Sequence, residues 1–318
     1  MQKRNLGKSG LRVSLVGLGC NNFGGITDLE GARRVVHKAL DAGINLFDTA
    51  DVYGKRGGSE TILGQILGER RKDIILATKF GMAMDDAETL KGASRRYIFS
   101  AAEASLRRLK TDWIDLYQIH FPDPLTPIEE TLRALDDLIR QGKVRYIGVS
   151  NHPAWKVAGA QWTSRDLGIN AFISCQDEYS LLVRGPERDL LPMMQEYGLG
   201  LLPYFPLASG LLSGKYKRGK LPEGSRLAVA PFAKRFLIES NWNLLEQLEN
   251  FCGKRGHTIL ELAFSWLAAN PLVSSVIAGA TRPEQVEQNV HAVNWTLTPD
   301  DLTEIDRITG KEGVGKSE

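Results

Sequence analysis

The chain has 318 residues, of which 42% are hydrophobic and 25% are charged, as is typical of a soluble globular protein rather than a disordered, collagen-like or coiled-coil chain. The 40 basic and 38 acidic residues leave a formal net charge of +2, which gives no reason to expect a nucleic acid or an anionic membrane as partner. No apolar run approaches the roughly 20 residues that a membrane-spanning helix needs.

The start of the chain and its cysteines favour a cytoplasmic location. Segment 1–7 lacks the apolar stretch of a secretory signal. The three cysteines, Cys20, Cys175 and Cys252, are odd in number, lie far apart and form no Cys-x-x-Cys pair. The five histidines show no ligand spacing such as His-Glu-x-x-His. We therefore expect a reducing compartment, with neither disulfides nor a metal site.

Short apolar runs that carry Val, Ile, Tyr and Phe alternate with amphipathic helical patterns along nearly the whole chain. Several of these runs are apolar at consecutive positions, which is typical of parallel strands covered by helices on both faces. The predicted strands are 11–19, 46–49, 74–79, 113–120, 144–150, 172–176, 199–204 and 274–279. The predicted helices are 28–42, 59–67, 94–109, 126–142, 153–166, 187–197, 243–252, 258–269 and 283–290, with a last one from Thr298.

Residues with a preference for helix ends support several of these boundaries. Thr27 stands before the first predicted helix as a candidate N-cap, and Gly43 follows that helix. Thr126, Pro127 and Glu129 supply a cap, a first-turn proline and an acidic first turn for the fourth helix. These signals separate the helices from the strands around them.

Eight strands, each followed by a helix, predict a (β/α)8 TIM barrel that forms a single domain over residues 1–318, with an N-terminal cap. A doubly wound parallel sheet is the competing architecture. The chain contains no linker-like tract and no internal repeat. The irregular stretch 205–241 forms a long loop after the seventh strand, and a loop of this length inside a compact domain is usually functional.

Reactive side chains follow three consecutive predicted strands. Asp48 and Tyr53 come at and after the end of the second strand, Lys79 ends the third and His120 ends the fourth. Chemistry in a (β/α)8 barrel takes place at the carboxyl ends of the strands. Alone, each residue is more simply a cap, a surface group or a packing residue. At one rim, the four together predict a proton-transfer site.

The chemistry of these residue types suits carbonyl reduction. Tyrosine is a weak acid at neutral pH, but an ammonium such as that of Lys79 lowers its pKa, and the Asp48 carboxylate keeps the ammonium in place and charged. Tyr53 can then donate a proton to a developing alkoxide, while the His120 imidazole orients and polarises the carbonyl oxygen. The hydride has to come from a cofactor, because no side chain supplies one.

The sequence resembles the aldo-keto reductase superfamily from residue 6 to the last helix. The resemblance rests on Phe-Asp-Thr-Ala-Asp-Val-Tyr-Gly at 47–54, Gly-Val-Ser-Asn at 148–151 and Gly-Ala-Thr-Arg-Pro-Glu-Gln at 279–285, in this order. It implies a (β/α)8 barrel and a reductase that uses a nicotinamide cofactor, usually NADPH, on a small carbonyl substrate. The catalytic residues that it implies are Asp48, Tyr53, Lys79 and His120, with Tyr53 as the general acid.

Two Gly-containing segments are expected to bind the cofactor phosphates. The stretch 206–215 is small and Gly-rich, so its backbone N–H groups can approach a pyrophosphate. The helix that opens after Gly279 offers free N–H groups to an anion. Segment 17–24 is not a GxGxxG fingerprint, because Asn22 stands where the third glycine belongs. We expect a tight loop there, with Phe23 as an apolar wall.

The remaining cofactor contacts follow from residue chemistry and from the resemblance. Thr281 and Arg282 suit the 2′-phosphate of NADPH, which predicts a preference for NADPH over NADH. The resemblance places Ser150, Asn151 and Gln176 at the nicotinamide carboxamide, Tyr204 on the nicotinamide ring, and Gln288 and Asn289 near the adenine. The predicted cofactor-binding residues are Gly19, Ser150, Asn151, Gln176, Tyr204, Pro206, Leu207, Ser209, Gly210, Leu211, Lys215, Gly279, Thr281, Arg282, Gln285, Gln288 and Asn289. The predicted substrate-binding residues are Phe23, Tyr53, Phe80, His120 and Phe121.

Two other functions stay open at this point. A strand-end lysine such as Lys79 also suits a barrel lyase that forms a Schiff base. The resemblance also includes channel-associated subunits, which implies a possible NADPH-binding redox sensor without significant turnover. Phe205 stands where many relatives have a small polar residue. Arg226 is expected to face solvent, with an anionic substrate or the cofactor phosphate as the alternatives. The sequence gives no signal for the identity of the carbonyl compound or for an oligomeric state.

Overall fold

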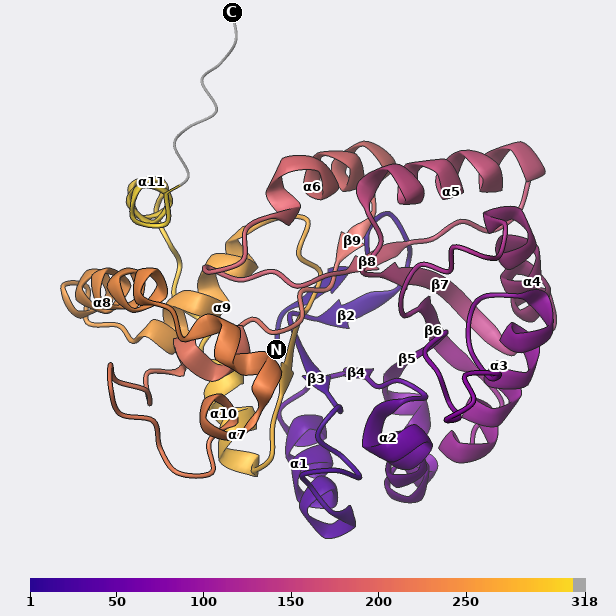
Figure 1. Ribbon diagram of the computed structural model, residues 1–318, viewed down its shortest axis with the longest axis horizontal. Coiled ribbons are helices and arrows are strands. Elements are labelled where there is room, and N and C mark those ends of the chain that lie inside the picture. The colour runs from indigo at the N-terminus through magenta and orange to yellow at the C-terminus, as the bar shows by residue number, and fades with distance from the viewer. Residues whose placement is uncertain (311–318) are drawn as a thin grey trace, which may run out of the picture.

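Residues 1–310 are described by the computed structural model, in which eight parallel strands form one sheet in the order β10-β3-β4-β5-β6-β7-β8-β9. The sheet curls around (Figure 1). Its two edges are joined, because Leu201 pairs with Val273 and the Ile277 N–H donates to the Pro203 oxygen at 3.1 Å. This closure confirms the predicted (β/α)8 barrel and excludes an open doubly wound sheet. The strands are β3 Val16–Gly19, β4 Leu46–Asp48, β5 Ile75–Phe80, β6 Ile114–Ile119, β7 Val144–Ser150, β8 Ser174–Gln176, β9 Gly200–Leu201 and β10 Val276–Gly279.

A β-hairpin closes the amino-terminal mouth of the barrel and forms the predicted cap. Its antiparallel strands are β1 (Lys3–Asn5) and β2 (Arg12–Ser14). Leu6 and Val13 are fully buried and pack against the apolar residues that β4, β5 and β6 direct into the barrel. The hairpin therefore completes the barrel core at the end opposite to the carboxyl ends of the strands.

The predicted strand 11–19 is wrong in one respect, because it is two strands. The Ser14 N–H, at the end of β2, donates to the side-chain oxygen of Asn45 at 2.6 Å. From Val16 onward the chain pairs with β10 in the barrel instead. The run is apolar on both sides of this change because the hairpin and the barrel share one core, so its composition carries no signal for the break.

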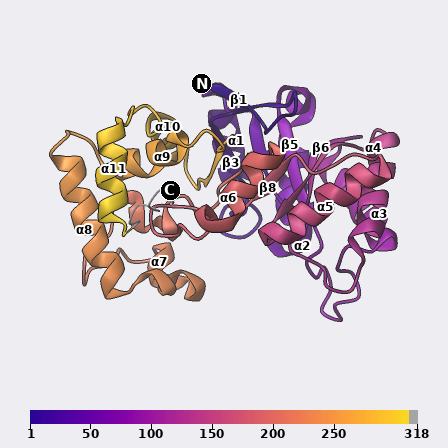
Figure 2. The ribbon, with the colours of Figure 1, turned by 90° about the horizontal axis from the view of Figure 1, so that it is seen from above.

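Helices cover the outside of the barrel. Neighbours from α2 to α6 pack against one another in sequence order, and α1 packs against α10. Figure 2 shows α8 and α11 side by side, on the far side of the molecule from α3 and α4. Within residues 1–310, no helix combines the length and the apolar character needed to cross a bilayer. The helices are α1 Leu29–Asp41, α2 Tyr53–Ile66, α3 Arg95–Leu109, α4 Ile128–Arg140, α5 Ala154–Leu167, α6 Pro186–Tyr197, α7 Arg226–Val229, α8 Glu239–Gly253, α9 Ile259–Ala269, α10 Pro283–His291 and α11 Pro299–Ile308.

Two predicted helix caps are shifted by one residue. The N-cap of α1 is Asp28 rather than Thr27, because the Asp28 carboxylate accepts a first-turn N–H at 2.8 Å. The N-cap of α4 is Pro127 rather than Thr126, whose hydroxyl instead donates to Asp123 at 2.7 Å. At α1, the neighbouring Asp28 supplies the cap. At α4, the Thr126 hydroxyl bonds to Asp123 instead of capping the helix.

The sequence predicted that the stretch 205–241 is irregular, but the structure shows that parts of it are helical. It contains the short helices η2 (Ala208–Ser213), α7 and η3 (Pro231–Phe236), and α8 already begins at Glu239. The segment folds back onto the protein because several of its apolar side chains join the core. These buried residues are Ala208, Leu211, Leu212, Tyr216, Leu227, Ala233 and Phe236.

A left-handed turn precedes the regular part of α2. Gly54, Lys55, Arg56 and Gly57 all have positive φ, between 63° and 107°. A Cβ on Gly54 would lie 2.4 Å from the Phe23 backbone oxygen, so the close approach of two loops requires glycine there. The regular helix then follows close to the predicted 59–67. This turn fixes where the chain re-enters a helix after the end of β4.

Candidate active site

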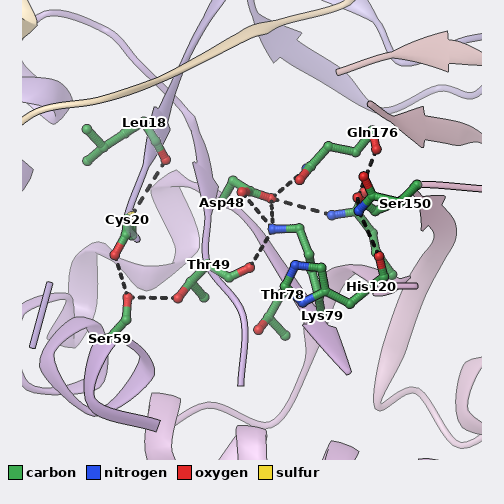
Figure 3. A network of polar contacts seen from close by, with 12 residues as sticks. Leu18, Cys20, Asp48, Thr49, Ser59, Thr78, Lys79, His120, Ser150 and Gln176 are labelled. Carbon is green, nitrogen blue, oxygen red and sulfur yellow. Dashed lines mark hydrogen bonds and ion pairs between the residues drawn. The ribbon is translucent and has the colours of Figure 1, made fainter. Parts of the chain in front are cut away.

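The ends of three neighbouring strands bring three of the predicted catalytic residues to one rim. Asp48 ends β4 and pairs with Ala77 of β5, Lys79 of β5 pairs with Gln118 of β6, and His120 directly follows β6. Parallel strands align their carboxyl ends, so these side chains meet at one mouth of the barrel. Figure 3 shows the Lys79 ammonium turned toward Asp48, with His120 nearby.

The Lys79 ammonium is enclosed by oxygen atoms. Its Nζ lies 2.9 and 2.7 Å from the two carboxylate oxygens of Asp48, and it donates to the Thr49 backbone oxygen at 2.9 Å. Both side chains of the ion pair are buried. Burial lowers the pKa of Lys79, but Asp48 and Tyr53 outweigh burial and raise that pKa above its ordinary value. The ammonium is therefore charged at neutral pH.

Two amides complete the hydrogen bonds of Asp48. The Gln176 amide donates to its Oδ1 at 2.8 Å, and Gln118 donates to the same oxygen at 3.4 Å. Gln176, predicted to bind the nicotinamide carboxamide, thus lies at the cavity with its amide directed toward Asp48 (Figure 3). These bonds hold the carboxylate in the orientation in which it contacts Lys79.

Tyr53, at the start of α2, lies between the ammonium and the imidazole. The Lys79 Nζ is 5.1 Å from the centre of the Tyr53 ring. The rings of Tyr53 and His120 meet edge to face, with centroids 5.7 Å apart and an interplanar angle of 81°. The structure thus brings together all four residues that the sequence singled out for catalysis.

The prediction that the pKa of Tyr53 is lowered below its ordinary value is wrong for the protein without a bound cofactor. Burial raises the pKa of Tyr53 above its ordinary value, Asp48 adds to the increase, and Lys79 offsets only part of it. The phenol therefore keeps its proton at neutral pH, and the ammonium beside it stabilises the phenolate that proton donation leaves behind.

The pKa of His120 is lowered, whereas that of Tyr53 is raised. Burial, reinforced by the Lys79 charge, lowers the pKa of His120 to about 3. The imidazole is therefore neutral across the physiological range, and it can donate a hydrogen bond without being an acid. His152, two residues beyond Ser150, is likewise buried, and burial lowers its pKa to about 4.

A cavity of about 710 Å³ opens at this rim. Most of the predicted site residues line it: Gly19, Asp48, Tyr53, His120, Phe121, Ser150, Asn151, Gln176, Tyr204, Pro206, Leu207, Ser209, Gly210, Lys215, Gly279, Thr281 and Gln285. The predicted residues that do not line it are Phe23, Lys79, Phe80, Leu211, Arg282, Gln288 and Asn289.

The expectation that Phe23 and Phe80 form walls of the cavity is wrong. Both side chains are fully buried in the core. Phe80 packs on Tyr117, with ring centroids 4.6 Å apart. Side chains alternate in direction along a strand, so Phe80 points away from the site that its neighbour Lys79 faces. Leu211 is also a core residue, whereas Arg282 and Gln288 are exposed.

Polar groups at and just beyond the ends of β6, β7, β8 and β9 form one connected wall of the cavity. The Tyr204 hydroxyl donates to the Asn151 side-chain oxygen at 2.7 Å, and the Asn151 amide donates to the His120 backbone oxygen at 3.0 Å. The Ser150 hydroxyl donates to the Gln176 backbone oxygen at 2.8 Å. Amide donors and acceptors and one aromatic ring thus lie beside the tetrad, as a nicotinamide ring and its carboxamide require.

A second wall of the cavity suits phosphate groups. Ala208, Ser209 and Gly210 have positive φ, a backbone arrangement in which successive N–H groups can face one anion. The Ser209 hydroxyl is buried, and within residues 1–310 it has no hydrogen-bond partner. Lys215, Thr281 before α10 and Gln285 in its first turn also line the cavity. The N–H groups of Thr281 and Arg282 are not free, as the sequence predicted, because they donate to the Gln285 side-chain oxygen at 2.8 and 3.3 Å. The residues present therefore fit a dinucleotide cofactor.

Arg226 was expected in solvent, and the structure corrects this. It is a cavity residue whose guanidinium donates to the Asn22 side-chain oxygen at 2.8 Å. The bond joins the segment after β9 to the loop after β3, and burial lowers the pKa of Arg226. The only sequence signal was its position in the long stretch 205–241, since a contact between residues 204 positions apart leaves no local pattern.

Several further lining residues were not named individually from the sequence, although the stretch after Tyr204 was expected to form a wall of the substrate site. Ile26 and Asn21 come from the loop after β3, and Val229 and Phe232 come from the segment after β9. Cys20 also lines the cavity, and burial raises the pKa of its thiol, so it stays protonated. Across residues 1–310, no group of three or more His, Cys, Asp or Glu side chains could hold a metal ion.

Comparison with known proteins agrees with this geometry. The model of the aldo/keto reductase family matches residues 15–309. A probable voltage-gated potassium channel subunit beta of Arabidopsis thaliana is 39% identical, over 97% of this chain and 96% of its own. An L-glyceraldehyde 3-phosphate reductase of Escherichia coli is 37% identical, over 96% of this chain and 92% of its own. An uncharacterized oxidoreductase of Bacillus subtilis is 36% identical, over 97% of this chain and 96% of its own. The chain belongs to the aldo-keto reductase family.

Proposed function

We propose that the protein is an NADPH-dependent reductase that converts aldehydes or ketones to alcohols, with Tyr53 as the proton donor. The observation that carries the proposal is the shared position of Tyr53 and His120 at one cavity, with the Lys79–Asp48 ion pair in contact with Tyr53. Membership of an oxidoreductase family supports it. The balanced reaction consumes one carbonyl compound, one NADPH and one proton, and yields the alcohol and NADP⁺.

The proposed roles follow from the protonation states. Tyr53 keeps its proton at neutral pH and is therefore ready to donate it to the carbonyl oxygen. Lys79 stabilises the phenolate that remains, and Asp48 holds Lys79. Neutral His120 orients the carbonyl oxygen by a hydrogen bond and cannot be the acid, because its pKa lies near 3. When bound, the reduced nicotinamide supplies the hydride.

The proposed cofactor contacts divide between the two walls of the cavity. Asn151, Ser150 and Gln176 offer amide and hydroxyl groups to the carboxamide, and Tyr204 offers its ring to the nicotinamide. The backbone of residues 207–210, with Lys215 and Arg226, faces the phosphates. Thr281 and the neighbouring exposed Arg282 form the proposed site for the 2′-phosphate, which favours NADPH over NADH.

The Schiff-base alternative is opposed by the state of Lys79. A Schiff base needs a neutral amine that a substrate can reach. Lys79 has no exposed surface, its ammonium is bound by Asp48 and Thr49, and its pKa is raised. An amine in this environment is both charged and inaccessible, so we do not retain a lyase.

A redox-sensing subunit remains the second candidate, because one relative is named as a probable potassium channel subunit beta. Such a subunit would bind NADPH and reduce a carbonyl compound once, without sustained turnover. The three cysteines are free and buried, in agreement with the cytoplasmic location that we propose for either function.

Comparing single-turnover with steady-state kinetics separates these two functions. Purified protein loaded with NADPH is mixed with a panel of aldehydes, and NADPH oxidation is followed during the first turnover and afterwards. A reductase oxidises many equivalents of NADPH at a rate that depends on the aldehyde. Oxidation of one equivalent followed by arrest would identify a sensor, and no oxidation with any aldehyde would refute the proposed function.

A further inference from the structure

A second cavity lies at the opposite mouth of the barrel from the tetrad. It has a volume of about 410 Å³, which is within the range of small-molecule sites in proteins. Its walls include the first half of β7, the segments that precede β8 and β9, and the hairpin turn at Lys8 and Ser9. Its described lining residues are all different from those of the cavity at the tetrad. We call it the amino-terminal cavity.

The hairpin turn is fixed at the edge of this cavity. The Lys8 N–H donates to the Gly198 oxygen at 2.8 Å. A Cβ on Gly7 would lie 2.5 Å from the same oxygen, and a Cβ on Gly198 would lie 2.1 Å from the Lys8 Cε. Glycine is therefore required at both positions, and the Lys8 side chain lies directly across Gly198. Because Gly198 lines the cavity, this packing keeps Lys8 at its edge.

The amino-terminal cavity carries two cations without acidic partners. Lys8 and Arg145 line it, and among residues 1–310 no aspartate or glutamate does so. In the same part of the chain neither cation forms an ion pair. The Arg145 guanidinium instead lies 5.5 Å from the centre of the Trp113 ring. Uncompensated cations around a hollow attract an anion, because the hollow concentrates their field.

Two amides in the wall offer acceptors to a ligand. The Gln161 amide nitrogen donates to the Phe172 oxygen at 2.9 Å, and the Asn170 amide nitrogen donates to Asp136 at 2.7 Å. Asp136 is also paired with Arg140, so its charge is compensated behind the wall. Both amide nitrogens are therefore engaged, and each side chain keeps its oxygen as an acceptor. Acceptors of this kind pair with the hydroxyl groups of a ligand.

Two tyrosines complete the polar groups of the cavity. Tyr146 and Tyr197 line it, and within residues 1–310 neither hydroxyl has a hydrogen-bond partner. A tyrosine offers a ring face to the C–H surface of a carbon chain and a hydroxyl to its polar groups. The cavity therefore combines cations for an anionic group with acceptors and rings for a hydroxylated body.

We propose that the amino-terminal cavity binds a hydroxylated organic anion, either a sugar phosphate or a sugar acid. Its anionic group lies between Lys8 and Arg145, and its hydroxyl groups donate to Gln161 and Asn170. Such a ligand joins the hairpin turn to the strands that it covers, so binding raises the stability of the closed barrel. The site is separate from the proposed reductase chemistry and does not depend on it.

The probe that tests this site is sorbitol 6-phosphate, which carries hydroxyl groups and a phosphate but no carbonyl group to reduce. Calorimetric titration of the full-length protein, with and without NADPH, measures its dissociation constant. We expect one site per chain, the same dissociation constant in both titrations, and weaker binding at higher ionic strength. Sorbitol and inorganic phosphate should bind at least about tenfold more weakly, because each lacks one half of the recognised groups.

Gluconate distinguishes the two kinds of anion. It keeps the hydroxyl groups and replaces the phosphate with a carboxylate. Tighter binding of gluconate than of sorbitol 6-phosphate assigns a sugar acid, and the reverse order assigns a sugar phosphate. Either order supports a hydroxylated anion, provided that sorbitol and inorganic phosphate bind more weakly than both.

Charge-removing variants locate the site. Lys8→Met and Arg145→Met should each weaken binding of the tighter probe about tenfold, and Lys8→Arg should retain most of the affinity. Lys3→Met removes an exposed lysine of the same hairpin, and Arg165→Met removes an arginine that also lies over a tryptophan ring. Neither residue lines the cavity, so both controls should keep the wild-type affinity. Thermal unfolding of each variant without ligand confirms that it is folded.

Four results would overturn the proposal. Absence of binding of both anionic probes at millimolar concentration removes the site. Displacement of the probe by NADPH places it in the cavity at the tetrad. Equal affinity for sorbitol or for inorganic phosphate excludes recognition of a hydroxylated anion. Unchanged affinity in both Lys8→Met and Arg145→Met excludes this location. None of these results bears on the reductase, which aldehyde turnover tests separately.

Discussion

The Lys79 ammonium lies 2.7 Å from a carboxylate oxygen of Asp48 and 5.1 Å from the centre of the Tyr53 ring. The ion pair is buried, so each charge depends on the other for stability, while the phenol depends on both for its chemistry. Stability and activity can therefore be separated by removing the two charges one at a time and together.

Lys79→Met leaves the Asp48 carboxylate buried without its counter-charge. Asp48→Asn leaves the Lys79 ammonium buried without its counter-charge. Each single change should lower the free energy of unfolding by about 3–5 kcal/mol, because an uncompensated charge stays buried. The double variant should be more stable than the less stable single variant, yet inactive. Urea unfolding monitored by circular dichroism measures this, and strictly additive losses in the double variant would contradict the proposed coupling.

The left-handed turn after Tyr53 predicts a stabilising substitution. Lys55 has φ of 63°, a conformation that costs an L-residue with a Cβ about 1–2 kcal/mol and costs glycine almost nothing. Because glycine also adds freedom to the unfolded chain, we expect a net gain of up to about 1 kcal/mol for Lys55→Gly. Lys55→Ala keeps the Cβ and is the control that should show no gain. Equal unfolding midpoints for the two variants would mean that the turn is not strained.

A buried carboxyl group near the tetrad predicts a pH dependence of stability. Burial and the neighbouring Glu60 raise the pKa of Asp51 to about 8, while Arg108 and Lys79 oppose the increase. The folded protein therefore keeps a proton that the unfolded chain releases above about pH 4. The stability contributed by this group is complete below pH 4 and is lost as the pH rises toward 8.

Asp51→Asn removes this titration. The difference in unfolding free energy between the variant and the wild type should shift in favour of the variant as the pH rises from 4 to 8, by at most about 1.4 kcal/mol per pH unit. Asp300, an exposed carboxylate in the first turn of α11, provides the control variant Asp300→Asn. A difference that is constant over this range would show that Asp51 is ionised in the folded protein.

Two arginines are expected to contribute differently to cofactor binding: Arg226 to the affinity for either cofactor, and Arg282 to the preference for NADPH over NADH. Arg226 lines the cavity beside Asn22, so Arg226→Ala should weaken NADPH and NADH alike, by about tenfold or more. Arg282 is exposed next to Thr281 at the start of α10, so Arg282→Ala should weaken NADPH alone. Titration of both cofactors measures the ratio, and an unchanged NADPH/NADH ratio in Arg282→Ala would remove Arg282 from the 2′-phosphate site.

Alternation of strands and helices was enough to predict the barrel and the convergence of its strand ends. In a closed parallel sheet, residues that end neighbouring strands meet at one mouth, so Asp48, Lys79 and His120 could be grouped from the sequence alone. Phe80 could not be placed in this way. It follows Lys79 directly, yet the alternation of side chains along β5 sends it into the core against Tyr117.

Other features depend on contacts that no local pattern encodes. The Arg226–Asn22 bond joins two loops far apart in the chain and exists only after the segment following β9 folds back. The pKa of Tyr53 depends on a balance between burial and the Lys79 charge, and residue types alone give the sign of each effect but not which one prevails.

The most direct test of the central claim is Tyr53→Phe, which removes the phenolic proton and keeps the ring between Lys79 and His120. Steady-state reduction of an aldehyde and NADPH binding are measured on the same preparation. We predict a loss of kcat of about 100-fold or more with an unchanged dissociation constant for NADPH, because only proton donation is lost. Reduction at the wild-type rate by Tyr53→Phe would contradict the assignment of Tyr53 as the acid.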